Sequence, residues 1–157
     1  MGPPEPRAAD VVRLRAGVRR FVRSFGLLAG DRTPCGAPIP LSVAYALVQL
    51  LEASRRDQVV TQQDLARALH IDKSNVTRLC ARLAREGFVE QRRAEHDGRA
   101  RMVSLTLKGR TLAERVERNS LTRFTQLLAA IPADAHDLVL SALETLATAA
   151  TLAPESP

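Results

Sequence analysis

The side chains whose types and spacing suit a chemical task lie between residues 72 and 83. Apolar residues recur there at helical spacing, at Val76, Leu79, Cys80 and Leu83. This spacing predicts a helix with one buried stripe. The other face carries hydrogen-bonding and cationic groups: Lys73, Ser74, Asn75, Thr77, Arg78 and Arg82. Such a face suits base edges and phosphates when a helix lies in the major groove of DNA, and the alternative is a polar face that only meets solvent.

The residues before this helix predict a second helix and a tight connection. Thr61 is placed to cap a short helix that runs to Leu69, because its side chain can accept a free amide hydrogen. Asp72 is placed in the same way to cap the following helix. Two short helices joined by about three residues form a helix-turn-helix.

The residues after this helix predict a β-hairpin. Gly87 suits the left-handed conformation that ends a helix. Residues 88–93 and 101–105 then predict two strands, and the charged loop between them has Asp97-Gly98 at its turn. A hairpin in this position is the wing of a winged helix.

The order and spacing of these segments resemble the multiple-antibiotic-resistance regulator (MarR) family. The motifs that carry the likeness are Thr77-Arg78-Leu79, Glu86-Gly87-Phe88-Val89-Glu90-Gln91-Arg92, Asp97-Gly98-Arg99-Ala100-Arg101, Ser104-Leu105-Thr106 and Gly109-Arg110. The likeness is close over residues 41–110 and rests on pattern alone in the flanking helices. It implies a mainly α fold with a small β-hairpin wing, in which N- and C-terminal dimerisation helices flank the winged helix-turn-helix.

The chain is expected to divide into five parts. Residues 1–8 form a disordered arm, residues 9–40 an N-terminal helix and loop, residues 41–106 the winged helix-turn-helix, residues 107–152 the C-terminal helices, and residues 153–157 a tail. The first helix is expected to begin at Asp10. Ser42, Thr106 and Asp134 are the expected N-caps of the later helices, and Pro132 is expected to end the long one.

The resemblance implies a sequence-specific DNA-binding regulator, expected to be a repressor that binds an inverted repeat as a homodimer. Ser74, Asn75, Thr77 and Arg78 are predicted to contact bases and nearby phosphates, and Lys73 and Arg82 mainly phosphates. In the wing, Arg99 is predicted to enter the minor groove. Asp97 would hold its guanidinium group, and Arg101 completes the DNA-binding set.

The resemblance also implies a signal that releases the DNA, either a small aromatic or phenolic effector or oxidation of a cysteine. The effector would bind between apolar walls from the first helix, from residues 45–51 and from residues 116–124. Cys35, in a loop rich in proline and glycine, is the candidate for a redox role, although the family's reactive cysteine usually lies in the first helix. Cys80 is predicted to be a core residue.

Composition and charge set the remaining bounds. The formal net charge is +6, and residues 61–110 carry 11 basic and 6 acidic side chains, whereas residues 111–157 carry 3 and 6. A basic middle segment suits DNA. The sequence has no apolar run of 18 residues and no signal peptide, which predicts a cytoplasmic protein without a membrane span.

Other classes of function receive less support from the sequence. We expect no enzyme, because no nucleophile stands near a base and no glycine-rich phosphate loop is present. We expect no cofactor and no metal site, because His70, His96 and His136 lack metal-ligand spacing. The remaining alternative is a winged helix used for protein interaction or as an architectural DNA-binding module without a specific operator. A protein-interaction module would favour apolar or acidic residues on the polar face, where Lys73, Arg78 and Arg82 lie instead.

Overall fold

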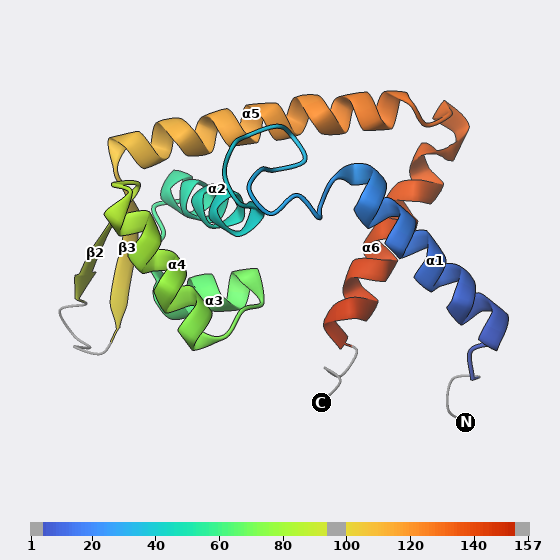
Figure 1. Ribbon diagram of the computed structural model, residues 1–157, viewed down its shortest axis with the longest axis horizontal. Coiled ribbons are helices and arrows are strands. Elements are labelled where there is room, and N and C mark those ends of the chain that lie inside the picture. The colour runs from blue at the N-terminus through green and yellow to red at the C-terminus, as the bar shows by residue number, and fades with distance from the viewer. Residues whose placement is uncertain (1–4, 94–99, 153–157) are drawn as a thin grey trace. The chain divides into compact units, whose positions relative to one another are not determined.

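The computed structural model describes residues 5–93 and 100–152, and this part of the chain is mainly helical with a small antiparallel sheet, as predicted (Figure 1). It separates into two compact units, residues 1–120 and 121–157, with the boundary inside one long helix. The elements are α1 (Ala8–Phe25), α2 (Leu41–Arg55), β1 (Val60–Thr61), α3 (Gln62–Leu69), α4 (Lys73–Arg85), β2 (Val89–Arg93), β3 (Arg101–Leu105), α5 (Leu107–Ala129), the 3₁₀ turn η1 (Ala133–Ala135) and α6 (His136–Leu152).

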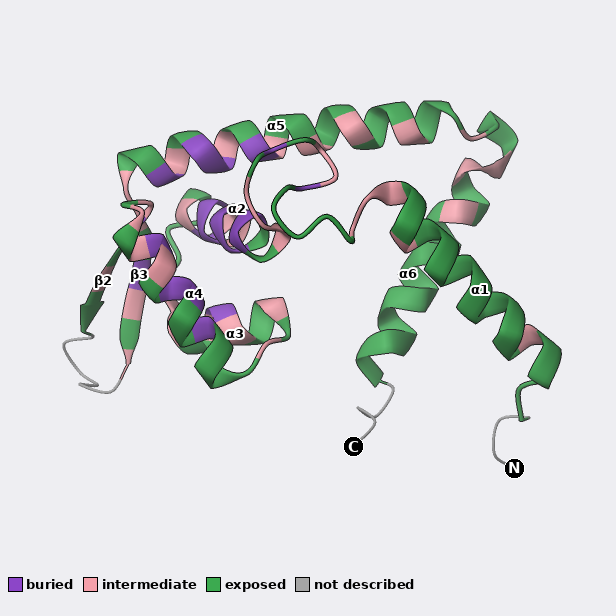
Figure 2. Cartoon of the chain, in the orientation of Figure 1, coloured by how far each residue is buried: buried purple, intermediate pink, exposed green. Residues whose placement is uncertain are grey.

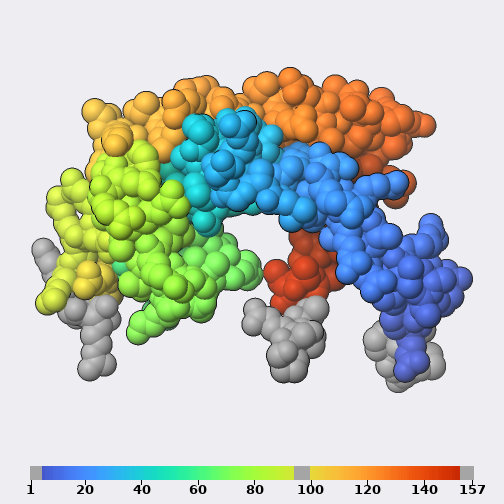
Figure 3. Space-filling model, viewed as in Figure 1, coloured from blue at the N-terminus to red at the C-terminus, as the bar shows by residue number. Residues whose placement is uncertain are grey.

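The hydrophobic core of the first unit is built around α2. Seven residues of α2 are buried, and the core is completed by apolar side chains from α3, α4, β2, β3 and the first half of α5 (Figure 2). In the space-filling view, α3, α4 and the strands are packed into one continuous body (Figure 3). The largest fully buried side chains are Leu47, Leu51, Leu65, Leu83, Val43, Val76 and Cys80. Burying one such leucine or valine contributes about 1.5–3 kcal/mol, so this cluster holds α4 in place.

The sheet has three strands in the order β1-β3-β2, and both pairings are antiparallel. The register sets Val103 of β3 opposite Gln91 on one side and Val60 on the other. The sequence predicted β2 and β3 but not β1. A strand of two residues has too little pattern to recognise, and it forms here because β3 offers a partner edge.

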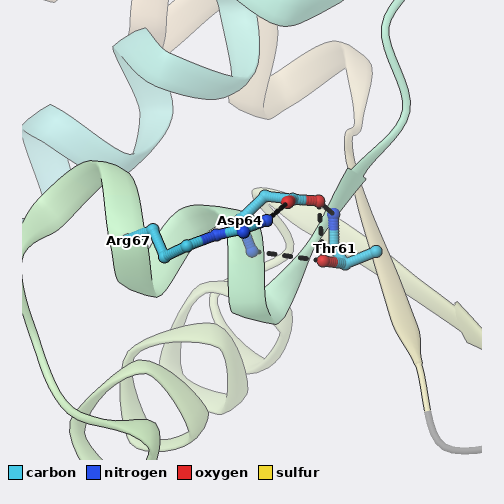
Figure 4. A network of polar contacts seen from close by, with 3 residues as sticks. All are labelled: Thr61, Asp64 and Arg67. Carbon is cyan, nitrogen blue, oxygen red and sulfur yellow. Dashed lines mark hydrogen bonds and ion pairs between the residues drawn. The ribbon is translucent and has the colours of Figure 1, made fainter.

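The predicted caps of the two short helices are confirmed. Thr61 Oγ1 accepts a hydrogen bond from the Asp64 amide at 3.1 Å, and the Asp64 carboxylate accepts one from the Thr61 amide at 2.9 Å (Figure 4). This reciprocal capping box satisfies two backbone donors. The Thr61 hydroxyl and amide, which donate to Asp64, lower the pKa of its carboxyl, and Arg67 binds the same group.

The N-terminus of α5 is joined closely to the end of α4. Thr106 caps α5 as predicted, because its Oγ1 accepts from the Gly109 amide at 3.0 Å, and the same hydroxyl donates to the Gly87 carbonyl at 2.7 Å. A Cβ atom on Gly109 would lie 1.9 Å from the Phe88 carbonyl oxygen. Only glycine therefore allows this approach of two backbones.

Three predicted helix starts need correction. The first helix begins at Ala8 rather than Asp10, so Ala8 does not belong to an arm. Pro40, not Ser42, is the N-cap of α2: its φ of −58° suits a helix entrance, and its carbonyl accepts from the Ala44 amide. Asp134 does not cap α6, because it lies inside η1, where a backbone bond from Ala135 to Pro132 tightens the chain.

The terminal helices expose their apolar faces. Every described residue of α1 and of α6 is exposed or half-buried (Figure 2). Leu14 and Phe21 of α1 keep 55% and 45% of their surface exposed, and Leu138 and Leu143 of α6 keep 73% and 52%. Within the described ranges, no helix combines the length and the apolar character needed to cross a bilayer.

Candidate nucleic-acid interface

Helix α4 has a buried apolar face and an exposed polar face, as the sequence predicted. Its buried residues are Val76, Leu79, Cys80 and Leu83. Burial raises the pKa of the Cys80 thiol to about 11, which supports a role in packing rather than in chemistry. On the outer face, the exposed residues are Lys73, Ser74, Asn75, Thr77 and Arg78. The structure therefore brings these five predicted DNA-binding residues onto one surface.

The joint between α3 and α4 fixes where this face begins. His70 ends α3 in the left-handed conformation, with φ 51°. Asp72 then caps α4, and its Oδ1 accepts hydrogen bonds from the Asn75 amide and from the Ser74 hydroxyl, both at 2.8 Å. These donors, the Asn75 amide first, lower the pKa of the Asp72 carboxyl. The first turn of α4 is thus held by a charged cap, as predicted.

A chain of hydrogen bonds holds Arg78 over this first turn. Its Nη2 donates to Asn75 Oδ1 at 2.8 Å and to Ser74 Oγ at 3.3 Å, and the Asn75 side-chain amide donates in turn to Asp72. The Asn75 amide is engaged at both ends. The Thr77 hydroxyl donates to the Lys73 carbonyl of its own helix at 2.7 Å. Among the side chains predicted to contact bases, Arg78 therefore has the most N–H groups available to donate hydrogen bonds to a partner.

Arg82 is placed less favourably for phosphate than the sequence suggested. It is half-buried, and its Nε donates to Glu86 Oε1 at 2.8 Å in an i,i+4 ion pair. A phosphate would have to compete with this carboxylate for the guanidinium group. The phosphate contact of Arg82 stays a prediction, and it would require breaking the ion pair with Glu86.

The base of the wing adds a pair of cations. Arg101 starts β3 and is exposed, and the register sets it opposite Arg93, which sequence reasoning did not assign to the site. Like charges placed opposite each other repel, so this pair is better matched to an anionic partner than to the free protein. The sequence feature that could have identified Arg93 as part of the site is its position next to the wing loop. Asp97 and Arg99 lie outside the described residues.

The loop from Thr33 to Ala37 closes on itself and covers Cys35. The Thr33 amide donates to the Ala37 carbonyl at 2.9 Å, and the Ala37 amide donates to Thr33 Oγ1 at 3.0 Å. Cys35 is half-buried against the core, with its Sγ 2.9 Å from Thr33 Oγ1. The Cys35 thiol is therefore partly covered, and a sensing role for Cys35 stays a prediction.

A groove of about 430 Å³ lies between the end of α2 and the sheet. It shares Leu50 with the predicted effector site, but its other walls come from the α2–β1 connection, Arg92 and β3. The predicted effector walls from α1 and α5 thus remain a prediction. Among residues 5–93 and 100–152, no group of three His, Cys, Asp or Glu side chains is placed to hold a metal ion.

Two short helices, a three-stranded wing sheet and a polar outer face on the second helix define a winged helix-turn-helix protein. The MarR family model matches residues 38–100. A curated relative, the uncharacterized HTH-type transcriptional regulator YdgJ of Bacillus subtilis (strain 168), is 28% identical over 101 residues. This match spans 64% of the present chain and 62% of YdgJ, which is less than two thirds of the relative's length.

Solved structures agree on the fold. The MepR–DNA complex of S. aureus is 16% identical with a TM-score of 0.64, and the match covers 92% of this chain and 99% of that one. NadR in complex with 4-hydroxyphenylacetate is 20% identical with a TM-score of 0.62, covering 94% and 98%. Residues 38–100 are therefore similar to the MarR family, and the curated relative is an HTH-type transcriptional regulator.

Proposed function

We propose that this chain is a sequence-specific DNA-binding regulator that acts in the cytoplasm as a homodimer on an inverted-repeat operator. The observation that carries the proposal is the outer face of α4, where Lys73 and Arg78 stand exposed beside capped, hydrogen-bonding residues. A helix of this kind lies in the major groove with its first turns against the base edges. A repressor role is the simplest one, since an operator-bound dimer blocks a promoter.

Arg78 is the proposed chief base contact. A guanidinium group can donate two parallel hydrogen bonds to O6 and N7 of guanine, the commonest specific contact in the major groove. The bonds to Asn75 and Ser74 hold Arg78 over the first turn of α4, which reduces the entropy lost on binding. The proposal thus assigns guanine to the base pair that faces this turn.

The phosphate contacts surround this base contact. Lys73 at the start of α4 and the cations Arg93 and Arg101 at the wing base would meet the backbone, with Arg82 after release from Glu86. Such contacts release counterions, so affinity should fall steeply as salt rises. From the sequence, Arg99 would enter the minor groove with Asp97 beside it.

The exposed apolar faces of α1 and α6 support the homodimer. Exposed apolar surface of this extent on two helices commonly marks an interface between proteins. MepR, which has the same fold, was solved bound to DNA. Two copies of α4 in a symmetric dimer would then meet successive major grooves, about one helical turn apart.

The releasing signal is proposed to be a small aromatic or phenolic acid. NadR, of the same fold, was solved with 4-hydroxyphenylacetate. An effector acts by favouring the state in which the two recognition helices have the wrong spacing for DNA, and its effect is limited by its differential affinity for the two states. 4-Hydroxyphenylacetate is therefore the first compound to add to an operator complex.

The deciding experiment selects random genomic DNA fragments on the purified protein at physiological salt and sequences those retained. An enriched inverted repeat supports the proposal. Retention that depends on salt but enriches no sequence contradicts it and favours the architectural or protein-interaction alternative.

The assignment of Arg78 is then tested on the selected operator. Arg78→Ala should weaken binding by about 1–3 kcal/mol and relax the preference for guanine at one position of each half-site. Arg56→Ala removes the same charge from an exposed position after α2 and is the matched control. Equal losses of operator affinity in both variants would show that Arg78 contributes only through the net charge of the protein.

A further inference from the structure

One polar side chain ties the wing to both helices of the helix-turn-helix. Gln91, in the middle of β2, donates from Nε2 to the Cys80 carbonyl oxygen of α4 at 3.1 Å. Its Oε1 accepts a hydrogen bond from Gln62 Nε2, at the first residue of α3, at 2.6 Å. A single amide therefore connects β2, α4 and α3.

This amide stands where the strand pattern calls for an apolar residue. Successive side chains of a strand alternate between its faces, and Gln91 shares the inner face with Val89, which is buried. Its partner in the register is Val103, which is also buried. A leucine or methionine would bury more apolar surface at this position, so the glutamine is not explained by the hydrophobic core.

The hydrogen bonds are not needed to satisfy the backbone either. Cys80 lies inside α4, where a carbonyl has its partner in the helix four residues on. The bond from Gln91 is an additional one. What this bond adds is orientation. The donor and the acceptor of a side-chain amide lie in one plane, and Gln91 uses both, so its two bonds orient β2 relative to α3 and α4.

The position of Gln91 along β2 indicates that its hydrogen bonds control the angle between the hairpin and α4. Gly87, with φ 74°, turns the chain between α4 and β2, so the angle of the hairpin against the helix depends on contacts beyond this turn. Gln91 makes such a contact halfway along β2, with the cations Arg93 and Arg101 two residue pairs further on. A small rotation at Gln91 moves those cations relative to the outer face of α4.

We propose that Gln91 is a positioning residue that sets the angle of the wing against α4, so that both engage DNA at the same time. This inference rests on the proposed function and adds a determinant that does not itself touch DNA. The helix would read the major groove while the wing base meets the neighbouring backbone. Loss of the tie leaves each element intact but uncouples their placement.

The test replaces Gln91 with methionine, which has a similar length but neither donates nor accepts at that position. Contacts of α4 are followed by protection of guanine N7 from methylation, and contacts of the wing by hydroxyl-radical footprinting of the backbone. Gln91→Met should weaken operator binding by about tenfold, the scale set by one or two hydrogen bonds. Guanine protection by α4 should remain at saturating protein, whereas the backbone protection by the wing should be lost.

Two further variants separate positioning from folding. Gln62→Met breaks only the bond to α3 and should give a weaker version of the same footprint. Gln63→Met, at the exposed neighbouring residue, should leave both footprints unchanged. The melting temperature of Gln91→Met should stay equal or rise, because apolar burial increases.

The outcomes divide as follows. A Gln91→Met protein that keeps both footprints, or that loses both together with its melting temperature, overturns the positioning role alone. A wild-type protein that gives no footprint on any selected sequence overturns the proposed function and this inference with it.

Discussion

The winged helix and the terminal helices differ in how they use their apolar residues. In the winged helix, α2 alone buries seven residues, and α4 buries its whole apolar stripe. In α1 and α6, the described residues are exposed or half-buried, although both helices carry apolar side chains at helical spacing. One region has completed its core within the chain, whereas the other has apolar faces that a second protein surface can cover.

The largest expected effect comes from placing a charge on the open face of α6. Leu143→Glu should prevent dimerisation and weaken operator binding by about a hundredfold or more, because a carboxylate buried in an apolar interface is left unpaired. Sedimentation measures the mass, and gel shift the affinity. The matched control is Glu144→Gln on the same helix, which should behave like the wild type. A Leu143→Glu protein that stays dimeric would show that this face is not the interface.

A pair of glycine substitutions compares the two regions directly. Gly109→Ala should lower the free energy of unfolding by about 3 kcal/mol, because the new Cβ meets the Phe88 carbonyl oxygen. Gly17→Ala, inside α1, meets no atom within 4 Å in the single chain and should raise stability by about 0.5–1 kcal/mol through helix propensity. Urea unfolding measures both. A destabilising Gly17→Ala would instead indicate that a partner helix approaches α1 closely at this glycine.

The smallest effect is expected at the ion pair that joins α2 to α5. Arg55 donates two hydrogen bonds to Glu117, each of 2.7 Å, and these bonds hold the pKa of the Glu117 carboxyl below its ordinary value of 4.5. A lowered pKa stabilises the fold above that value, and the contribution is lost as pH falls through the pKa of the folded state. Glu117→Gln should therefore lower the melting temperature at pH 7 by about 2 °C or less, since the pair lies at the surface, where solvent screens the charge of Arg55. The difference from the wild type should disappear in acid. A difference that persists in acid would mean that packing, not charge, joins these helices.

Sequence reasoning succeeded where the signal is local. The caps at Thr61 and Asp72, the buried stripe of α4 and the turn at Gly87 each depend on a few adjacent residues, and all are confirmed. It failed where the competing residue has its own backbone preference. Pro40 displaced Ser42 as a cap in this way.

Contacts between elements that are distant in sequence could not be predicted from local sequence patterns. The two-residue strand β1 exists because β3 lies beside it, and the tie from Gln91 to Gln62 and Cys80 joins residues up to 29 positions apart. In the candidate site, the polar face of α4 could be predicted. The engagement of Asn75 by Asp72 and Arg78 could not, because it depends on which rotamers the side chains adopt.

The junction at Gly109 has a consequence for how this fold can diversify. The hairpin leaves α4 and returns to α5 at one place, where Lys108 donates to the Glu86 carbonyl at 2.7 Å and its ammonium lies 4.8 Å from the centre of the Phe88 ring. Because this closure lies at the base of the paired strands, insertions and deletions between β2 and β3 leave the two helix ends joined. Descendants of such a protein can thus vary the length of the segment between β2 and β3 while they inherit an unaltered scaffold.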